Sequence, residues 1–340
     1  MNFRVDLDQD RFEKLSKLAE RRGVVTAELA CQVVRSYIDK RGPRREALQA
    51  YDYQLTERQR DVLWTLHDFQ AMTFRQIDRA FSSSPESEGT YTSKCLVSLV
   101  ELDLAERHHL DFQPYGYDRT IFTLTPQTVY VLEVARRGPR GVRVVRRPYP
   151  PQLLTPRQLS HHLMTVDVGV AFKSPKNRAL GELVEWSMQS EYRFPYMGSL
   201  RRIIPDAHGL WDSGDEFIHS FIVEVVRSRQ EAHLVRRIRN YNYWQQAKAF
   251  EKDEGTRTVP PILFITTSHL HQEVFRSIVF GTLAAHVGVA EAARNLVFGL
   301  AVLDDLVEMG PCAPVWSLPL QSEDGLEFGE VCVRLSKMVS

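Results

Sequence analysis

The stretch 201–244, RRIIPDAHGLWDSGDEFIHSFIVEVVRSRQEAHLVRRIRNYNYW, decides the fold of the C-terminal half of this chain. Its segment 217–226 is rich in β-branched and aromatic residues and follows the turn signal DSGD at 212–215, which predicts a strand after a hairpin turn. An arginine-rich helix is predicted next. Asp206 and Glu224 then stand on neighbouring strands, where two carboxylates suit a divalent cation with oxygen ligands, as in phosphodiester chemistry.

Several short motifs flank and extend this stretch. They are LSHH at 159–162, PDA at 205–207, FIVEV at 221–225, RIRNY at 237–241, ILFITTS at 262–268 and GPCAPVW at 310–316. Their order resembles the PD-(D/E)xK nuclease-like fold and, more closely, the replication-relaxation family of mobile-element proteins, which carries a degraded version of that fold. The resemblance covers roughly half of the chain. It implies an α/β/α restriction-endonuclease-like domain with a mixed sheet over residues 156–340.

One position departs from the nuclease pattern. That pattern has a lysine two residues after the second acid, but here the place is taken by Val226. Arg227 is expected on the opposite sheet face, whereas Arg237 can reach in from the helix, although a guanidinium cannot act as a base. The resemblance implies Asp206, Glu224 and Arg237 as catalytic residues, with Mg²⁺ or Mn²⁺ on the two carboxylates, only if the domain cleaves DNA. In the alternative, the carboxylates hold arginines of the helix in ion pairs and no cofactor is bound.

Composition and charge set the class of protein. With 340 residues, 43% hydrophobic and 25% charged, the chain has room for two or three soluble domains. It has no apolar run of about 18 residues and no signal-peptide pattern at its start, so we expect no membrane span and a cytoplasmic protein. We expect neither disulfides nor a zinc site, because the four cysteines lack metal-ligand spacing: Cys31, Cys95, Cys312 and Cys332.

The net charge is zero, but the basic residues are unevenly distributed. Residues 136–147 contain six arginines and no acid, and residues 227–239 contain five arginines against one acid. Such local stripes are typical of phosphate contact, whereas a solvated helix face more often mixes lysine with glutamate. The predicted phosphate contacts are Arg143, Arg146, Arg227, Arg236 and Arg239.

The N-terminal 42 residues have the pattern of one strand and two helices. Residues 2–7 alternate strictly between polar and apolar side chains, which predicts a strand. A helix is predicted over about 9–22, ended by Gly23, and a second begins behind Thr26 as its N-cap.

This order and length resemble the ribbon-helix-helix family. The resemblance implies a homodimer through the N-terminal strand, with Asn2, Arg4 and Asp6 facing the bases of double-stranded DNA and the helix start at Thr26 holding a phosphate. In the alternative, residues 1–42 pack as an edge strand and helical hairpin on the same chain. Residues 43–54 are interpreted as a linker.

Residues 55–137 predict three helices followed by a β-hairpin. The helices are expected at 55–69, 72–81 and 90–102, the strands at 105–111 and 120–124, with a closing helix at 125–137. This order resembles a winged helix-turn-helix. The resemblance places Thr90, Tyr91, Ser93 and Lys94 near DNA. A protein-binding role is the alternative, because Lys94 is the one cation on the presumed recognition helix. Residues 138–155 are interpreted as a basic linker containing several prolines.

The third domain is expected to begin with a helix over 156–172. His161 on this helix is interpreted as a hydrogen-bonding partner, with a metal-ligand role as the alternative. The remaining elements of the predicted mixed sheet are strands at 183–194, 203–207, 217–226, 262–266 and 296–303 and helices at 231–252 and 272–280.

The whole pattern predicts an α+β multidomain protein and, from the resemblances, a sequence-specific DNA-binding protein of a bacterial mobile element. It would act as a transcriptional regulator or as a replication or transfer accessory factor, with a protein of the mobile-element machinery as a further partner. One alternative is a metal-dependent endonuclease targeted by its N-terminal modules. Another is a non-enzymatic assembly factor that uses the winged helix for protein contacts.

Overall fold

The computed structural model describes residues 55–82, 89–137, 154–175, 181–188, 190–214, 218–227, 231–253, 260–287, 298–322 and 325–331. The predictions for the ribbon-helix-helix segment, the linker at 43–54 and most of the basic linker lie outside these residues. So do six predicted DNA contacts: Asn2, Arg4, Asp6, Thr26, Arg143 and Arg146. No helix in the described ranges is long and apolar enough to cross a membrane.

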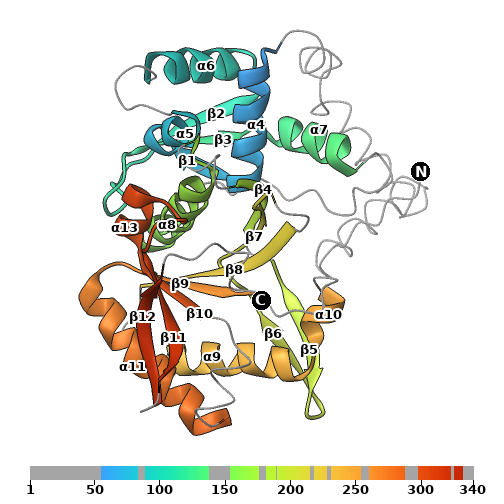
Figure 1. Cartoon of the computed structure of the whole chain (residues 1–340). Helices are drawn as coiled ribbons and strands as arrows, with labels where there is room; N and C mark the ends of the chain where they lie inside the picture. Colours follow the sequence, from blue (N-terminus) through green and yellow to red (C-terminus); the bar gives the residue numbers. More distant parts are fainter. Residues whose placement is uncertain are drawn as a thin grey trace, which may run out of the picture.

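The first part of the described chain combines helices with a small antiparallel sheet of order β1-β3-β2 (Figure 1). The predicted three helices, hairpin and closing helix are all present, and the short strand β1, which the sequence pattern did not indicate, joins the hairpin. The elements are α4 (Glu57–Phe69), β1 (Ala71–Thr73), α5 (Phe74–Phe81), α6 (Gly89–Glu101), β2 (Ala105–His109), β3 (Thr120–Leu124) and α7 (Pro126–Arg137).

Threonine caps start three of the helices, and each cap has a glutamine three residues later. Thr56 precedes α4, Thr73 precedes α5, and Thr155 precedes α8 (Pro156–Lys173). In each case the threonine hydroxyl accepts from the glutamine backbone N–H, and the glutamine side chain accepts from the threonine N–H. These capping boxes satisfy backbone donors that the first helical turn leaves without partners. The predicted caps at residues 56 and 73 are confirmed.

The second part is built on a seven-stranded mixed sheet of order β12-β11-β10-β9-β8-β7-β4. Strands β8, β9 and β10 run parallel, and the other neighbouring pairs are antiparallel. The predicted α+β class with a mixed sheet is confirmed. The strands are β4 (Glu182–Met188), β7 (Ala207–Asp212), β8 (Ile218–Val226), β9 (Ile262–Thr266), β10 (Phe298–Val302), β11 (Trp316–Ser322) and β12 (Gly325–Val331).

Helices cover both faces of this sheet. Along β8, Phe221, Val223 and Val225 belong to the apolar cluster with α8. Ile222 and Val226 pack in a second cluster with α9 (Glu231–Gln246) and α11 (His269–Val287). This alternation is the period of two expected of a strand, and burial on both sides explains its continuous apolar sequence. The remaining helices are α9 (Glu231–Gln246), α10 (Ala249–Asp253), α11 (His269–Val287) and α13 (Leu303–Met309).

Two strand predictions were wrong. The single strand expected at 183–194 is divided, because β4 ends at Met188 and β5 (Tyr192–Tyr196) begins a separate hairpin with β6 (Ser199–Ile203). The strand expected at 203–207 does not exist, since β6 ends at 203 and β7 begins at 207. Pro205 lies between them and has no N–H to donate to a ladder. Local alternation does not reveal that a chain changes from one sheet to another.

The two parts share one apolar cluster and pack closely through α8, which lies between them in Figure 1. The rings of Phe69 on α4 and Trp186 on β4 stack with their centroids 5.7 Å apart. Gly169 on α8 permits this approach, because a Cβ there would lie 2.3 Å from the Phe69 ring and 2.8 Å from the Trp186 ring. Asp167, two residues before Gly169 on α8 and buried, accepts hydrogen bonds from Gln76 of α5 at 3.0 Å and from Tyr117 of the β2–β3 connection at 2.6 Å.

Candidate nucleic-acid interface

The β7–β8 pairing brings the two predicted acids together. Because Ala207 pairs with Val223 in antiparallel register, Asp206 comes opposite Glu224. The Asp206 backbone N–H donates to the Val223 carbonyl at 3.1 Å, and the Val225 N–H donates to the Asp206 carboxylate at 2.8 Å. The hairpin deduced from the turn signal therefore does place both carboxylates at one site.

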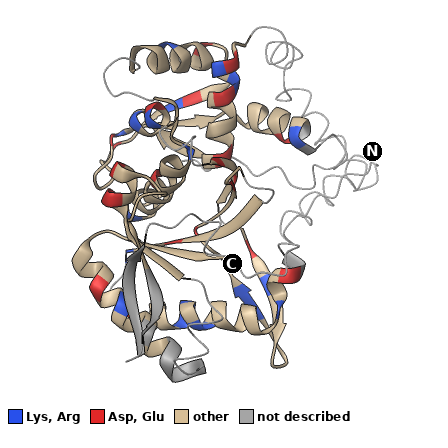
Figure 2. Cartoon of the chain, viewed as in Figure 1, with Lys and Arg blue, Asp and Glu red and all other residues tan. Residues whose placement is uncertain are grey.

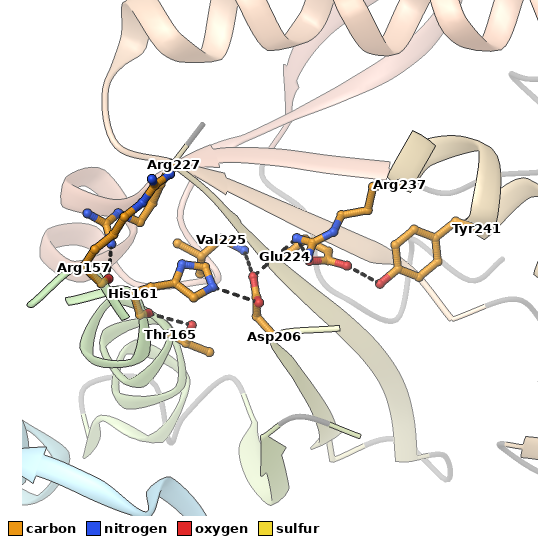
Figure 3. Close-up of polar contacts among 9 residues, drawn as sticks. All are labelled: Arg157, His161, Thr165, Asp206, Glu224, Val225, Arg227, Arg237 and Tyr241. Carbon is orange, nitrogen blue, oxygen red and sulfur yellow. Dashed lines mark hydrogen bonds and ion pairs between the residues drawn. The ribbon is translucent and has the colours of Figure 1, made fainter. Parts of the chain in front are cut away.

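Figure 3 shows a row of side chains that runs from His161 through the two acids to Tyr241. His161 Nε2 lies 2.9 Å from Asp206 Oδ1, and the Tyr241 hydroxyl donates to Glu224 Oε1 at 2.5 Å. Arg237 donates to Glu224 Oε2 and lies 3.7 Å from Asp206 Oδ2. All four carboxylate oxygens thus have partners, and the predicted alternative, in which helix arginines pair with the acids, describes this geometry.

The pKa values of the two carboxyls are shifted in opposite directions. Glu224 is 0% exposed, and burial raises its pKa to about 8 although the Arg237 guanidinium acts to lower it. Burial also acts to raise the pKa of Asp206, but the His161 hydrogen bond and the charges of His161 and Arg237 outweigh it and hold that pKa below its usual range. The negative charge of the pair therefore resides mainly on Asp206. Burial and the neighbouring Glu224 keep the pKa of Tyr241 well above its usual value, so its hydroxyl remains a donor.

These residues do not fit a divalent cation. Mg²⁺ and Mn²⁺ need several oxygen ligands, but the carboxylate oxygens of Asp206 and Glu224 are engaged, and the cation between them is Arg237. Within the described ranges, no group of three or more His, Cys, Asp or Glu side chains is placed to hold a metal. Val226, at the lysine position of the nuclease pattern, supplies no group to orient a water. His161 serves as the hydrogen-bonding partner of Asp206.

A cleft of about 570 Å³ opens beside this row. Its walls come from the start of α8, the end of β6, the end of β8 and one side of α9. Arg227, expected on the opposite sheet face, follows the end of β8 and lines this cleft together with Arg237. Its guanidinium donates to the backbone carbonyl of Arg157 at 2.6 Å. Figure 2 shows the basic residues along α9. The basic side chains that line the cleft are Arg157, His161, Arg202, Arg227, His233, Arg236 and Arg237.

Residues 63–259 match the family described as replication-relaxation, which is more than half of the chain and includes the acid pair and α9. The chain belongs to the replication-relaxation family. This membership connects it with the replication or transfer of mobile elements. No curated protein and no solved structure matches the chain.

In this replication-relaxation protein the predicted contacts of the third helix share one exposed surface. Thr90, Tyr91, Ser93 and Lys94 are all exposed on α6, and Tyr91 is 53% exposed. Their neighbours Thr92, Cys95 and Leu96 turn into the core, as helical spacing requires.

Of the other predicted DNA contacts in the described residues, two lie in the cleft and one lies outside it. Arg227 and Arg236 line the cleft, whereas Arg239 is exposed on α9 and is not among the lining residues. Sequence reasoning missed Arg157 and Arg202. The only sequence feature that marks Arg157 is its place in the first turn of a capped helix. Arg202 lies in β6, a strand that the sequence pattern did not predict.

Proposed function

We propose that this chain is a DNA-binding protein that acts in the replication or transfer of a mobile element and holds DNA phosphates without cleaving them. The observation that supports this most strongly is the charge of the cleft. Within the described residues, no carboxylate lies within ion-pair distance of Arg157, Arg227 or Arg236, while the one acid in the lining, Glu224, is engaged by Arg237 and Tyr241. Gathered guanidinium groups without counter-charges suit phosphate oxygens, which they bind through charge-assisted hydrogen bonds.

The element order of the first part supports a winged-helix role. Three helices and a three-stranded antiparallel sheet have the sequence helix, strand, helix, helix, strand, strand. In proteins of this type the third helix enters the major groove. Here that helix is α6, and its exposed Thr90, Tyr91, Ser93 and Lys94 would contact double-stranded DNA.

Residues 1–42 would add the sequence-specific part of the interaction as a ribbon-helix-helix dimer. Arg4 would read the bases, with Asn2 and Asp6 on the same face of the strand. Thr26 would begin a helix that holds a phosphate. Deleting residues 1–8 should convert dimers into monomers, which sedimentation measures. A truncated protein that still sediments as a dimer would show that another interface dominates.

The proposal is tested with full-length protein, supercoiled and linear DNA, and either magnesium or manganese. We expect a mobility shift with both DNA forms and no nicked or shortened product. Lys94→Ala on α6 should weaken binding and lower the slope of log K against log salt by roughly 0.9 per lost phosphate contact on duplex DNA. Arg193→Ala is the matched control, because Arg193 is exposed on β5 and pairs with Glu191 outside the cleft.

Two results would contradict this proposal. Cleavage that both Asp206→Ala and Glu224→Ala abolish would place the chain among metal-dependent endonucleases. Absence of affinity for any DNA would favour the assembly role, in which the winged helix binds protein.

A further inference from the structure

The connection between β2 and β3, residues 110–119, is fastened to α8. The Tyr115 backbone N–H donates to the Ser160 hydroxyl at 2.9 Å, and the Tyr117 hydroxyl donates to buried Asp167 at 2.6 Å. Yet Tyr115 is 66% exposed, more than Tyr91 on α6 or Tyr130 on α7. The fold therefore holds the backbone of this connection in place and leaves one aromatic ring in solvent.

The same end of α8 forms a wall of the basic cleft. Ser160 lies one helical turn from Arg157, whose side chain lines the cleft and whose carbonyl accepts from Arg227. Burial and the nearby charge of Arg157 lower the pKa of Arg227, while Tyr117 and Tyr115 act to raise it, so both tyrosines lie within electrostatic range of this guanidinium. The backbone of Tyr115 and the cleft arginine Arg157 are therefore held at the same end of α8.

The electrostatics of this surface favour an anion. Arg157 and Arg227 repel each other, and no carboxylate acts on Arg227 among the described residues. A phosphate between the two guanidinium groups would remove that repulsion and replace water with charge-assisted hydrogen bonds. The apolar side chains Ile203 and Ile204 also line the cleft, so the sugar face of a nucleotide has an apolar surface to contact.

The size of the cleft suits single-stranded DNA better than double-stranded DNA. About 570 Å³ is within the range of sites that enclose a small molecule, so the cleft has room for one nucleic-acid backbone and cannot enclose a double helix. An exposed aromatic ring beside a basic groove is the combination by which proteins bind single strands, because every base has a face on which a ring can stack.

We propose that Tyr115, Arg157 and Arg227 form a binding site for single-stranded DNA, in which the Tyr115 ring stacks on a base and the two arginines hold the adjoining phosphates. This inference rests on the proposed DNA-binding function and names the form of DNA that the cleft takes. With duplex DNA on α6 and a single strand at the β2–β3 connection, the chain would bind DNA at the point where a duplex opens into a single strand.

Fluorescence anisotropy of the full chain tests the site, with an oligothymidine of about 12 nucleotides and a blunt duplex of about 20 base pairs as probes. Tyr115→Ala should weaken oligothymidine binding on the order of tenfold and change duplex binding by less than about twofold. Arg157→Ala should lower the salt slope for the oligothymidine by about 0.7. Lys94→Ala on α6 should show the opposite preference, with the duplex weakened and the oligothymidine unchanged.

Matched controls are Tyr130→Ala on α7, where the tyrosine is 36% exposed, and Arg193→Ala on β5; both should bind the two probes like wild type. Wild-type protein that binds the duplex but not the oligothymidine would refute the single-strand site and leave the proposed function standing. Binding of neither probe would refute both. Tyr115→Ala that weakens both probes equally would show that this ring contacts duplex DNA and would overturn the single-strand assignment.

Discussion

The buried carboxyl of Glu224 should make the stability of this fold depend on pH, and Glu224→Gln should remove that dependence. Burial raises the pKa of Glu224 from 4.5 to about 8. Between these values the folded chain holds a proton that the unfolded chain has released. The contribution of protonated Glu224 to the free energy of unfolding is therefore fully present below pH 4.5. It is lost as the pH rises toward 8, and the free energy of unfolding then falls by up to about 1.4 kcal/mol per pH unit.

The expected change in the free energy of unfolding follows from the interval between the two pKa values of Glu224. It is reduced because Glu224 is coupled to charged neighbours. Wild type should lose about 2–5 kcal/mol more than Glu224→Gln between pH 4.5 and pH 8. Asp206 has the opposite effect on stability, and at a lower pH. The free energy that its ionised carboxylate contributes to folding is present above its usual pKa of 3.8 and is lost as the pH falls below that value. His162, whose pKa burial lowers to about 4, titrates in both proteins and cancels in the difference.

Urea unfolding of the full chain at about four pH values between 5 and 8 measures this difference. Glu191→Gln is the control, because Glu191 lies at the surface, its pKa is lowered through its hydrogen bond with Arg193, and its stability curve should parallel that of wild type over this interval. If the Glu224→Gln and wild-type curves are also parallel, Glu224 is ionised throughout and the charge assignment of the pair is wrong.

Two further predictions concern packing at two glycines and one buried hydrogen bond. Gly209→Ala should destabilise the fold by about 1–3 kcal/mol, because the added Cβ would lie 2.2 Å from the Phe221 ring on the neighbouring strand. In contrast, a Cβ added at Gly281 in α11 would have no atom within 4 Å, so Gly281→Ala should be neutral or stabilise the fold by up to about 1 kcal/mol. Thermal unfolding measures both variants, and equal changes in stability would contradict the packing argument. Tyr117→Phe should cost about 1–3 kcal/mol, since it leaves the buried Asp167 carboxylate without one donor, and an unchanged urea midpoint would show that this bond contributes nothing.

Much of the local structure follows from short sequence patterns. Thr56 and Thr73 begin helices because each has a glutamine three residues later that completes a capping box. The turn signal at 212–215 and the β-branched run after it predict the β7–β8 hairpin, and antiparallel pairing then brings Asp206 opposite Glu224. These features depend on residues close together in the chain, so a single sequence contains the information.

The candidate site could be predicted only in part. The proximity of Asp206 and Glu224, and Arg237 as a residue that reaches them, were predicted. His161 was expected to form a hydrogen bond, but its partner was not identified, because 45 residues separate it from Asp206. Arg157 was missed altogether, since its position in the cleft depends on where α8 packs.

Local residue order therefore determines where helices and strands begin and that two acids share a hairpin, because capping, turn formation and strand alternation act over a few residues. Tertiary packing decides the rest. It seats α8 between the helical part and the sheet, puts Arg237 between the two carboxylates, and holds the Tyr115 backbone against the end of α8 that carries Arg157. These contacts join residues that are not neighbours in the chain, and their energy depends on burial, which a local sequence pattern does not show.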